Sequence, residues 1–267
     1  MAILTISREY GSGGREIGQA VAKLLGYEYI NKEKVLEDIR SEGGKWGAWA
    51  ENLDEHCPSV WEKYDWSFRG FAALVQRSVL HYALNDKVVI IGRGGNFLLK
   101  DIPFAYRIRV IAPMESRVGL IMKREKVDKD TARWLAEKTD SERACFIHTI
   151  YGKRWDDKAE YDRVFDTAVQ SVEEIVQMAQ QELVGRERRE SDEARNVLKM
   201  RAVAAQVKAG IATNPHFFVP VLDVYFDGKG LVLRGVTHDP REHKRIEQEA
   251  GKLAGSQPIR CELHYRR

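Results

Sequence analysis

The residues best suited to chemistry in this chain are the glycines and arginines of residues 7–18, Ser-Arg-Glu-Tyr-Gly-Ser-Gly-Gly-Arg-Glu-Ile-Gly. The apolar run at 3–6 predicts a buried strand before them, and apolar residues at helical spacing over 17–25 predict a helix after them. Glycines leave room for backbone N–H groups to converge on an anion, and a helix N-terminus adds the positive end of its dipole. This order of elements predicts a loop that binds phosphate.

The loop departs from the standard phosphate-binding pattern G-x-x-x-x-G-K-[ST]. Arg15 and Glu16 stand where the lysine and the hydroxyl residue are expected, and Glu9 replaces the first glycine. A shifted register also lacks the lysine and leaves a glutamate near the phosphates. The alternative interpretation is an ordinary glycine-rich turn between a strand and a helix. The candidate nucleotide-binding residues are Ser7, Arg8, Gly11, Ser12, Gly13, Gly14, Arg15 and Glu16.

A second group of glycines follows the apolar run at 88–91, which predicts another buried strand. Ligands of open parallel sheets bind outside the carboxyl ends of the strands, so we expect both glycine loops to face the same crevice. Arg93, between Gly92 and Gly94, carries a planar guanidinium that matches a phosphate with two hydrogen bonds. We therefore predict that Arg93 holds the phosphate of an acceptor. The alternative is a structural arginine paired with a carboxylate.

Three stretches together resemble the signature of the cytidylate kinase-like family, whose members are distant relatives of nucleoside monophosphate kinases. They are residues 6–18, residues 88–96 and the sequence Lys-Thr-Asp-Ser-Glu-Arg at 138–143, in the family's order, and the likeness extends over about residues 1–183. The resemblance implies a P-loop kinase fold with ATP and Mg²⁺ as cofactors. It also implies phosphoryl transfer from ATP to a nucleoside monophosphate, such as cytidylate, or to a similar small acceptor.

Three arginines are the predicted catalytic residues, and the resemblance supplies the role of the third. Arg15 replaces the missing lysine as a charge clamp, Arg93 grips the acceptor phosphate, and Arg143 matches a lid arginine that closes over ATP. No metal ligand is secure from the sequence. The side chains that we consider for Mg²⁺ are those of Glu16, Ser7 and Ser12.

The acceptor site is predicted to combine the second glycine loop with the end of the strand at 27–30. Asn31 stands there where the relatives carry an acidic residue, and its alternative role is that of a turn asparagine. Residues 41–66 hold four of the six tryptophans, at positions 46, 49, 61 and 66, whose rings can stack on a nucleobase; we favour a small satellite core or dimer contact instead. The predicted acceptor-binding residues are Asn31, Gly92, Arg93 and Gly94.

Alternation of strands and helices predicts the fold class. Five predicted strands alternate with helices, which favours an α/β fold, a P-loop kinase-like, doubly wound, parallel five-stranded sheet. The strands are expected at 3–6, 27–30, 88–91, 106–112 and 164–167, and the main helices at 17–25, 32–40, 68–84, 113–126, 128–146 and 169–183.

From residue 185 the pattern changes class. Residues 185–192 are polar with both charge signs and predict a linker between a nucleotide-binding domain at 1–184 and a small α+β domain at 193–267. Residues 227–235 resemble the centre of a BON domain, which implies a module that binds a protein or lipid partner. The elements expected in this domain are helices at 193–213 and 241–253 and strands at 219–226, 231–236 and 259–265.

Composition limits the class of protein. The 267 residues are 43% hydrophobic, enough for a sizeable core, and the net charge of +3 is too small to indicate nucleic acid by itself. No apolar run has membrane-spanning length, and the strand at the start leaves no room for a signal peptide. Cys57, Cys145 and Cys261 are widely spaced and predict reduced thiols, so we expect a cytoplasmic protein. A homo-oligomer remains an open alternative.

A rival function comes from a different class. Loss of the loop lysine and gain of Glu16 can remove turnover while keeping the pocket. The protein would then be a catalytically weak or inactive nucleotide-binding regulator whose C-terminal module binds a partner. A third reading, binding of nucleic acid or anionic lipid by the mildly basic part after residue 185, predicts affinity that falls steeply with salt.

Overall fold

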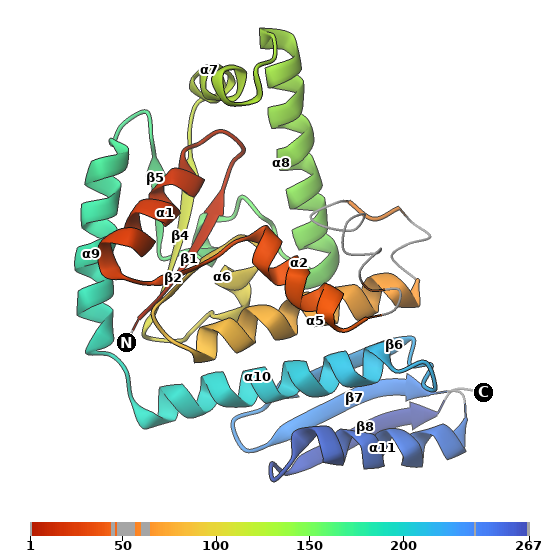
Figure 1. Cartoon of the computed structure of the whole chain (residues 1–267). Helices are drawn as coiled ribbons and strands as arrows, with labels where there is room; N and C mark the ends of the chain where they lie inside the picture. The colour runs from red at the N-terminus through yellow and green to blue at the C-terminus, as the bar shows by residue number, and fades with distance from the viewer. Residues whose placement is uncertain (1, 44–45, 47–56, 60–64, 238, 266–267) are drawn as a thin grey trace. The chain divides into compact units, whose positions relative to one another are not determined.

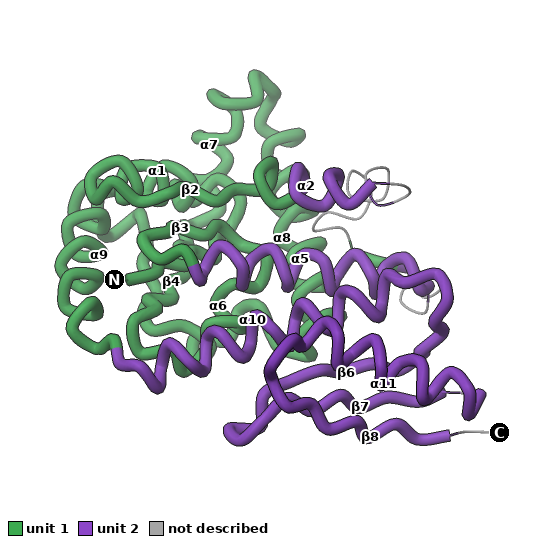
Figure 2. Tube along the Cα trace, turned by 60° about the horizontal axis from the view of Figure 1, so that its bottom comes forward, with its two compact units in different colours: residues 1–35, 54–58, 85–190 green, residues 36–53, 59–84, 191–267 purple. Residues whose placement is uncertain are grey.

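The computed structural model describes residues 2–43, 46, 57–59, 65–237 and 239–265 (Figure 1). The chain divides into two compact units, shown in different colours in Figure 2. The first unit comprises residues 1–35, 54–58 and 85–190, and the second comprises 36–53, 59–84 and 191–267. The chain therefore leaves the first unit and returns to it before the final segment.

The first unit is built on a five-stranded sheet in which all neighbouring strands are parallel. The strand order is β2-β3-β1-β4-β5, so β1 lies at the centre. Its residues are almost entirely buried, as expected for a parallel strand covered on both faces. The fold-class prediction is thus confirmed. The strands are β1 (Ile3–Arg8), β2 (Glu28–Ile30), β3 (Val88–Ile91), β4 (Ala105–Ile111) and β5 (Arg163–Asp166).

Helices α1 and α9 pack against one face of this sheet. Ile17 and Val21 of α1 and Ile175 of α9 join strand residues such as Leu4 and Ile108 in one buried cluster. The capping box of Ser171 and Glu174 starts α9 at Val172, three residues later than predicted, because both side chains bond the other's backbone N–H. The helices of this unit are α1 (Gly14–Leu25), α6 (Gly95–Leu98), α7 (Met114–Glu125), α8 (Lys129–Tyr151), the 3₁₀ turn η1 (Lys158–Glu160) and α9 (Val172–Glu187).

Helix α2 (Lys32–Ser41) begins in the first unit and ends in the second. The second unit has a small sheet in the order β6-β7-β8, with β6 and β7 antiparallel and β7 and β8 parallel. Residues of α10 and α11 such as Val207 and Ile246 form its core with Val224 and Leu233. The remaining elements are α5 (Trp66–Leu84), α10 (Asp192–Thr213), β6 (Val221–Phe226), β7 (Leu231–Thr237), α11 (Pro240–Ala254) and β8 (Ile259–Tyr265).

Two of the four tryptophans of residues 41–66 lie in the described part of the chain. Trp46 is buried, and its ring meets that of Trp66 edge to face with 6.2 Å between centroids. A Cβ on Gly70 would lie 2.3 Å from Cη2 of Trp46, so α5 needs a glycine there. This packing favours the satellite core over base stacking. Trp49 and Trp61 lie outside the described residues.

The prediction of three reduced thiols is wrong for two of the cysteines. Cys57 and Cys145 form a disulfide with a Cα–Cα distance of 5.2 Å. Their separation of 88 positions along the chain hid this proximity, because only the fold brings α8 against the segment at 57. Cys261 is free, and burial raises the pKa of its thiol to about 11. None of the helices in the described ranges has the length and hydropathy that a bilayer crossing requires.

Core packing of the second unit can be tested within a single strand. Val224 is 7% exposed in the core cluster, whereas Val221, three residues earlier in β6, is 59% exposed. Val224→Ala removes buried methyl groups and leaves a cavity, so we expect it to lower the free energy of unfolding by about 2 kcal/mol. The matched Val221→Ala should change it by less than about 0.5 kcal/mol. Equal shifts in the urea midpoint of the full chain would contradict this packing.

Candidate functional site

The glycine loop between β1 and α1 follows a path that side chains would block. Gly11 and Gly13 have φ values of +80° and +81°, which L-residues rarely adopt. A Cβ on Gly11 would lie 2.9 Å from Cδ1 of Ile121 and 3.0 Å from the carbonyl oxygen of Arg117. The loop backbone therefore lies directly against α7. The loop leads into the first turn of α1, where no side chain caps the helix N-terminus. This is the geometry that an anion-binding loop requires.

Two buried serines, Ser7 near the end of β1 and Ser12 in the loop, bond to the surrounding fold. The Ser12 hydroxyl is buried and donates to the carbonyl oxygen of Val110 at 3.1 Å, while Thr167 donates to the Ser12 carbonyl at 3.1 Å. Ser7 Oγ lies 2.9 Å from Nε1 of Trp155, which donates to it, and 3.2 Å from the Tyr161 hydroxyl. Both serine hydroxyls are thus committed to the fold, which leaves Glu16 as the metal candidate of the three.

Glu9 sits at the start of the loop in a cluster of charges. Its carboxylate accepts the backbone N–H of Ala112 at 3.2 Å and lies 3.5 Å from Nη2 of Arg109 and 3.6 Å from Nε of Arg117. Both arginines are buried. Sequence reasoning read Glu9 only as a missing glycine, because its partners are about a hundred residues away along the chain. The signal available in the sequence was an arginine within the apolar fourth strand, Arg109, and another in the following helix, Arg117.

A cavity of about 360 Å³ opens over the glycine loop. That volume lies within the range of small-molecule sites. Arg15 and Glu16 of the first turn of α1 are exposed and line it. The other lining residues come from the loop, from α7 and from α8: Arg8, Glu9, Tyr10, Gly11, Ser12, Gly13, Gly14, Arg124, Glu125 and Arg143.

A second, much tighter pocket lies at the carboxyl ends of β1 and β3. Arg93 is 2% exposed, has a φ of +57°, and lines this pocket together with Arg8 and Arg143. The hollow measures only about 10 Å³, so arginine side chains must shift outward before a phosphate group fits. Gly94 is required beside it, because a Cβ there would lie 2.2 Å from Cε2 of Tyr151. Three arginines line this one hollow, and arginine is suited to binding a dianion.

The structure brings most of the predicted site residues to these two cavities. Arg8 and Arg143 line both of them, and Nη1 of Arg143 donates to the Arg8 carbonyl at 3.1 Å. Asn31 lines neither cavity; its Oδ1 accepts the backbone N–H of Lys34 at 3.1 Å and caps α2. The residues of the tight pocket are Ser7, Arg8, Gly92, Arg93, Gly94 and Arg143, joined by Asn96, Phe146, Ile147 and Trp155, and Gly11, Ser12, Gly13, Gly14, Arg15 and Glu16 line the larger one.

Asp140 is a site residue whose contacts sequence reasoning missed. Its carboxylate accepts the backbone N–H of Tyr10 at 2.8 Å and Nη1 of Arg117 at 2.5 Å, and it lies 3.8 Å from Nη1 of Arg143. Helix α8 is thereby tied to the glycine loop. The spacing of Asp140 and Arg143, three positions apart on a helix, places both on one face and was readable in the sequence.

Mg²⁺ is the metal that a phosphoryl-transfer site of this kind implies. Within the described ranges, no three His, Cys, Asp or Glu side chains come together as a metal-binding group. Mg²⁺ commonly uses one or two carboxylates, waters and substrate phosphates instead of an all-protein cage. The exposed carboxylate of Glu16 in the larger cavity fits that requirement.

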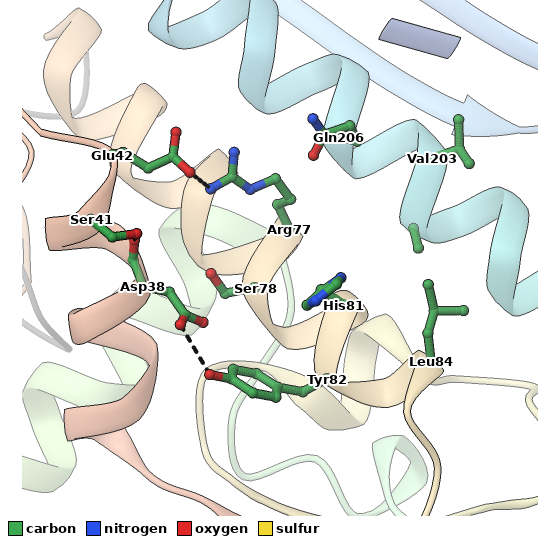
Figure 3. Close-up of a pocket in the computed structure, with 11 residues that line it drawn as sticks. Asp38, Ser41, Glu42, Arg77, Ser78, His81, Tyr82, Leu84, Val203 and Gln206 are labelled. Atoms are coloured by element: carbon green, nitrogen blue, oxygen red, sulfur yellow. Dashed lines mark hydrogen bonds and ion pairs between the residues drawn. The ribbon is translucent and has the colours of Figure 1, made fainter. Parts of the chain in front are cut away.

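A further cavity, of about 590 Å³, lies within the second unit between α2, α5 and α10 (Figure 3). Its charged side chains are paired with each other. Arg77 binds Glu42, and the Tyr82 hydroxyl donates to Oδ1 of Asp38 at 3.0 Å (Figure 3). Val203 and Leu84 add an apolar wall. It has no glycine loop and no cluster of arginines, so we do not assign phosphate chemistry to it.

Comparisons with known proteins agree with the geometry of the first unit. The family described as cytidylate kinase-like matches residues 3–169. A cytidylate kinase of Methanocaldococcus jannaschii is 27% identical over 176 residues, which cover 65% of this chain and 92% of that protein.

Two solved structures are also similar. An uncharacterized protein from Eubacterium ventriosum has a TM-score of 0.54 and 21% identity, over 69% of this chain and 99% of its own, and shares the fold. A shikimate kinase from Bacteroides thetaiotaomicron has a TM-score of 0.42 and 16% identity, over 68% of this chain and 98% of its own, which is too distant to carry an argument.

Substitution of Gly11 tests whether the loop is a phosphate site. Gly11→Ala meets both the positive φ and the crowding by Ile121 and the Arg117 carbonyl, so the loop must move. We expect affinity for ATP to fall at least about tenfold in calorimetric titration. Gly26→Ala is the matched control, because Gly26 has a φ of +67° but nothing within 4 Å of its Cβ position. ATP affinity that is unchanged in Gly11→Ala, or that falls equally in both variants, would contradict the assignment.

Proposed function

The chain belongs to the cytidylate kinase-like family, and from that premise we propose that it transfers the γ-phosphoryl group of ATP to a nucleoside monophosphate or a similar small acceptor. One observation carries the proposal. Arg8 and Arg143 line both the cavity over the glycine loop and the tight pocket that contains Arg93. A phosphoryl group that moves from a donor on the loop to an acceptor beside Arg93 passes these two guanidiniums. Cytidylate is the acceptor suggested by the family's name and by the archaeal relative.

The donor side of the site is the glycine loop. The Ser12 N–H donates to the Glu9 carbonyl at 3.2 Å, which leaves the backbone N–H groups of Gly11, Gly13 and Gly14 and the N-terminus of α1 to supply positive potential for the phosphates of ATP. Arg15, on the first turn of α1, takes the place of the standard lysine as a mobile charge clamp, since its side chain is exposed in the cavity. Mg²⁺ held by Glu16 and the phosphates would supply further neutralisation of the donor's charge.

The acceptor side is the tight pocket at the end of β3. The guanidinium of Arg93 binds the acceptor phosphate, and Arg8 in the same pocket helps to neutralise the charge of that phosphate. Phosphoryl transfer passes through a loose transition state, in which charge spreads over three equatorial oxygens. Arg143 on α8 and Arg8 on β1 stabilise that charge, because both lie where the two cavities meet. The protein's own contribution is therefore alignment and charge.

The C-terminal part of the second unit, residues 193–267, is proposed to be a separate binding module. We retain a nucleotide-binding domain at 1–184, a linker at 185–192 and a BON-like domain at 193–267 as the proposed organisation. The order α10, β6, β7, α11, β8 supports the BON-like assignment, and Asp227 holds the hairpin by accepting the N–H groups of Lys229 and Gly230. A protein or lipid partner is proposed with it. The cytoplasmic location expected from reduced thiols loses that support, because Cys57 and Cys145 form a disulfide.

A nucleotide-binding regulator without turnover is the second candidate function. It is favoured by the exposed Arg15–Glu16 pair in place of the lysine and hydroxyl residue of a standard loop. The two functions differ in one measurable respect, since only the kinase forms a phosphorylated product.

Replacement of Arg15 tests the catalytic proposal. We expect Arg15→Ala to lower the turnover number with ATP and cytidylate by at least about a hundredfold, because a transition-state charge contact is lost. Its melting temperature should stay that of the wild type, since Arg15 is exposed. The control is Arg154→Ala, which removes a 77% exposed arginine elsewhere in the first unit. Undiminished product formation by Arg15→Ala would refute the assigned role.

A further inference from the structure

Tyr10 is the loop residue that connects the glycine loop to α7 and α8. Its backbone N–H donates to Oδ1 of Asp140 at 2.8 Å, and its carbonyl oxygen accepts Nη1 of Arg117 at 3.3 Å. Its hydroxyl donates to Oε1 of Glu125 at 2.9 Å. The loop reaches toward these helices from the end of β1 (Figure 1). The backbone N–H of Tyr10 thus binds α8, and its carbonyl oxygen and hydroxyl bind α7.

The ring of Tyr10 also lies close to two arginines of those helices. Cζ of Arg124 is 4.7 Å from the ring centroid, and Cζ of Arg143 is 5.8 Å from it. Both distances lie within the reach of a cation–π interaction. Both arginines line the cavity over the glycine loop. The ring is therefore placed to hold two guanidiniums at the rim of the donor site.

The hydroxyl keeps the ring in one orientation. A phenol is protonated at neutral pH and can donate there, and burial, followed by the hydrogen bond to Glu125, raises the pKa of Tyr10 further. Long arginine side chains lose substantial rotamer entropy when they are fixed on a ligand. A ring that holds the arginine side chains before ATP binds reduces this loss of entropy, because part of the ordering is already in place.

We propose that Tyr10 is a positioning residue, whose ring holds Arg124 and Arg143 over the glycine loop before ATP binds. The inference rests on the proposed function, because it takes the cavity over the loop as the site of the ATP phosphates. The competing explanation is packing alone, since Tyr10 also contacts a small apolar cluster between α7 and α8 that includes Val118 and Ile121.

A mutant cycle separates these explanations. Tyr10→Leu removes the ring's π-system but keeps an apolar side chain, and Tyr10→Phe keeps the ring without the hydroxyl. Each is made in the wild type and in an Arg124→Ala/Arg143→Ala background, and the dissociation constant for ATP is measured by calorimetry. In the wild type we expect Tyr10→Leu to weaken ATP binding about tenfold and Tyr10→Phe by less than about threefold. In the double-alanine background Tyr10→Leu should cost less than about twofold, because its effect acts through the arginines.

The same full loss from Tyr10→Leu in both backgrounds would overturn the proposal in favour of packing. Melting curves of Tyr10→Phe and Tyr10→Leu show whether each variant is folded. If the Leu variant unfolds, the Phe variant keeps the test decisive. A loss of ATP affinity of tenfold or more in folded Tyr10→Phe would also overturn the role of the ring. A wild type that binds ATP but forms no product refutes the proposed function, while the cycle still decides the role of Tyr10. A wild type that does not bind ATP refutes both.

Discussion

The close approach of the glycine loop to its neighbours is the constraint on which the site depends. A Cβ on Gly14 would lie 2.6 Å from Cβ of Arg8, and one on Gly11 would meet the backbone of α7. The loop can lie there only because these residues lack side chains, and its backbone is then exposed to the cavity. Glu9, Ser12 and Tyr10 fix it to β4, α7 and α8. The path of the backbone and the position of the arginines are therefore set by the same contacts.

Charge balance explains how so many arginines can lie together. Burying a guanidinium is costly unless carboxylates and hydrogen bonds compensate it. Glu9 lies beside Arg109 and Arg117, and Asp140 beside Arg117 and Arg143. Stacking of Arg109 on Trp155, at 4.1 Å from Cζ to the ring centroid, adds to this. These fixed charges give the first unit an electrostatic environment prepared for phosphate before any ligand arrives.

The strands and the parallel sheet of the first unit could be predicted from the sequence. Its strands are short continuous apolar runs bounded by glycine or polar residues, a pattern typical of strands buried on both faces. Both glycine loops could be placed at one edge of the sheet because parallel strands point the same way. Observed helix ends differ from the predicted ends by a few residues where a capping residue fixes the first turn. Ser171, which caps α9, is an example.

Contacts between distant parts of the chain could not be predicted. The Cys57–Cys145 disulfide and the bond from Ala112 to Glu9 join residues 88 and 103 positions apart. The direction of a side chain was equally hidden, since Ser12 turns inward to Val110 and Asn31 caps its own helix. Residue type indicated what these side chains can bond, but the packing of the whole unit decided what they do bond.

Product analysis with ATP, Mg²⁺ and a panel of nucleoside monophosphates tests the central claim most directly. Separation of the nucleotides follows the formation of ADP and of the phosphorylated acceptor together. The account predicts one ADP for each acceptor molecule phosphorylated, with one monophosphate strongly preferred. ATP binding without any phosphorylated acceptor across the panel would contradict transfer to a nucleoside monophosphate and favour the nucleotide-binding regulator.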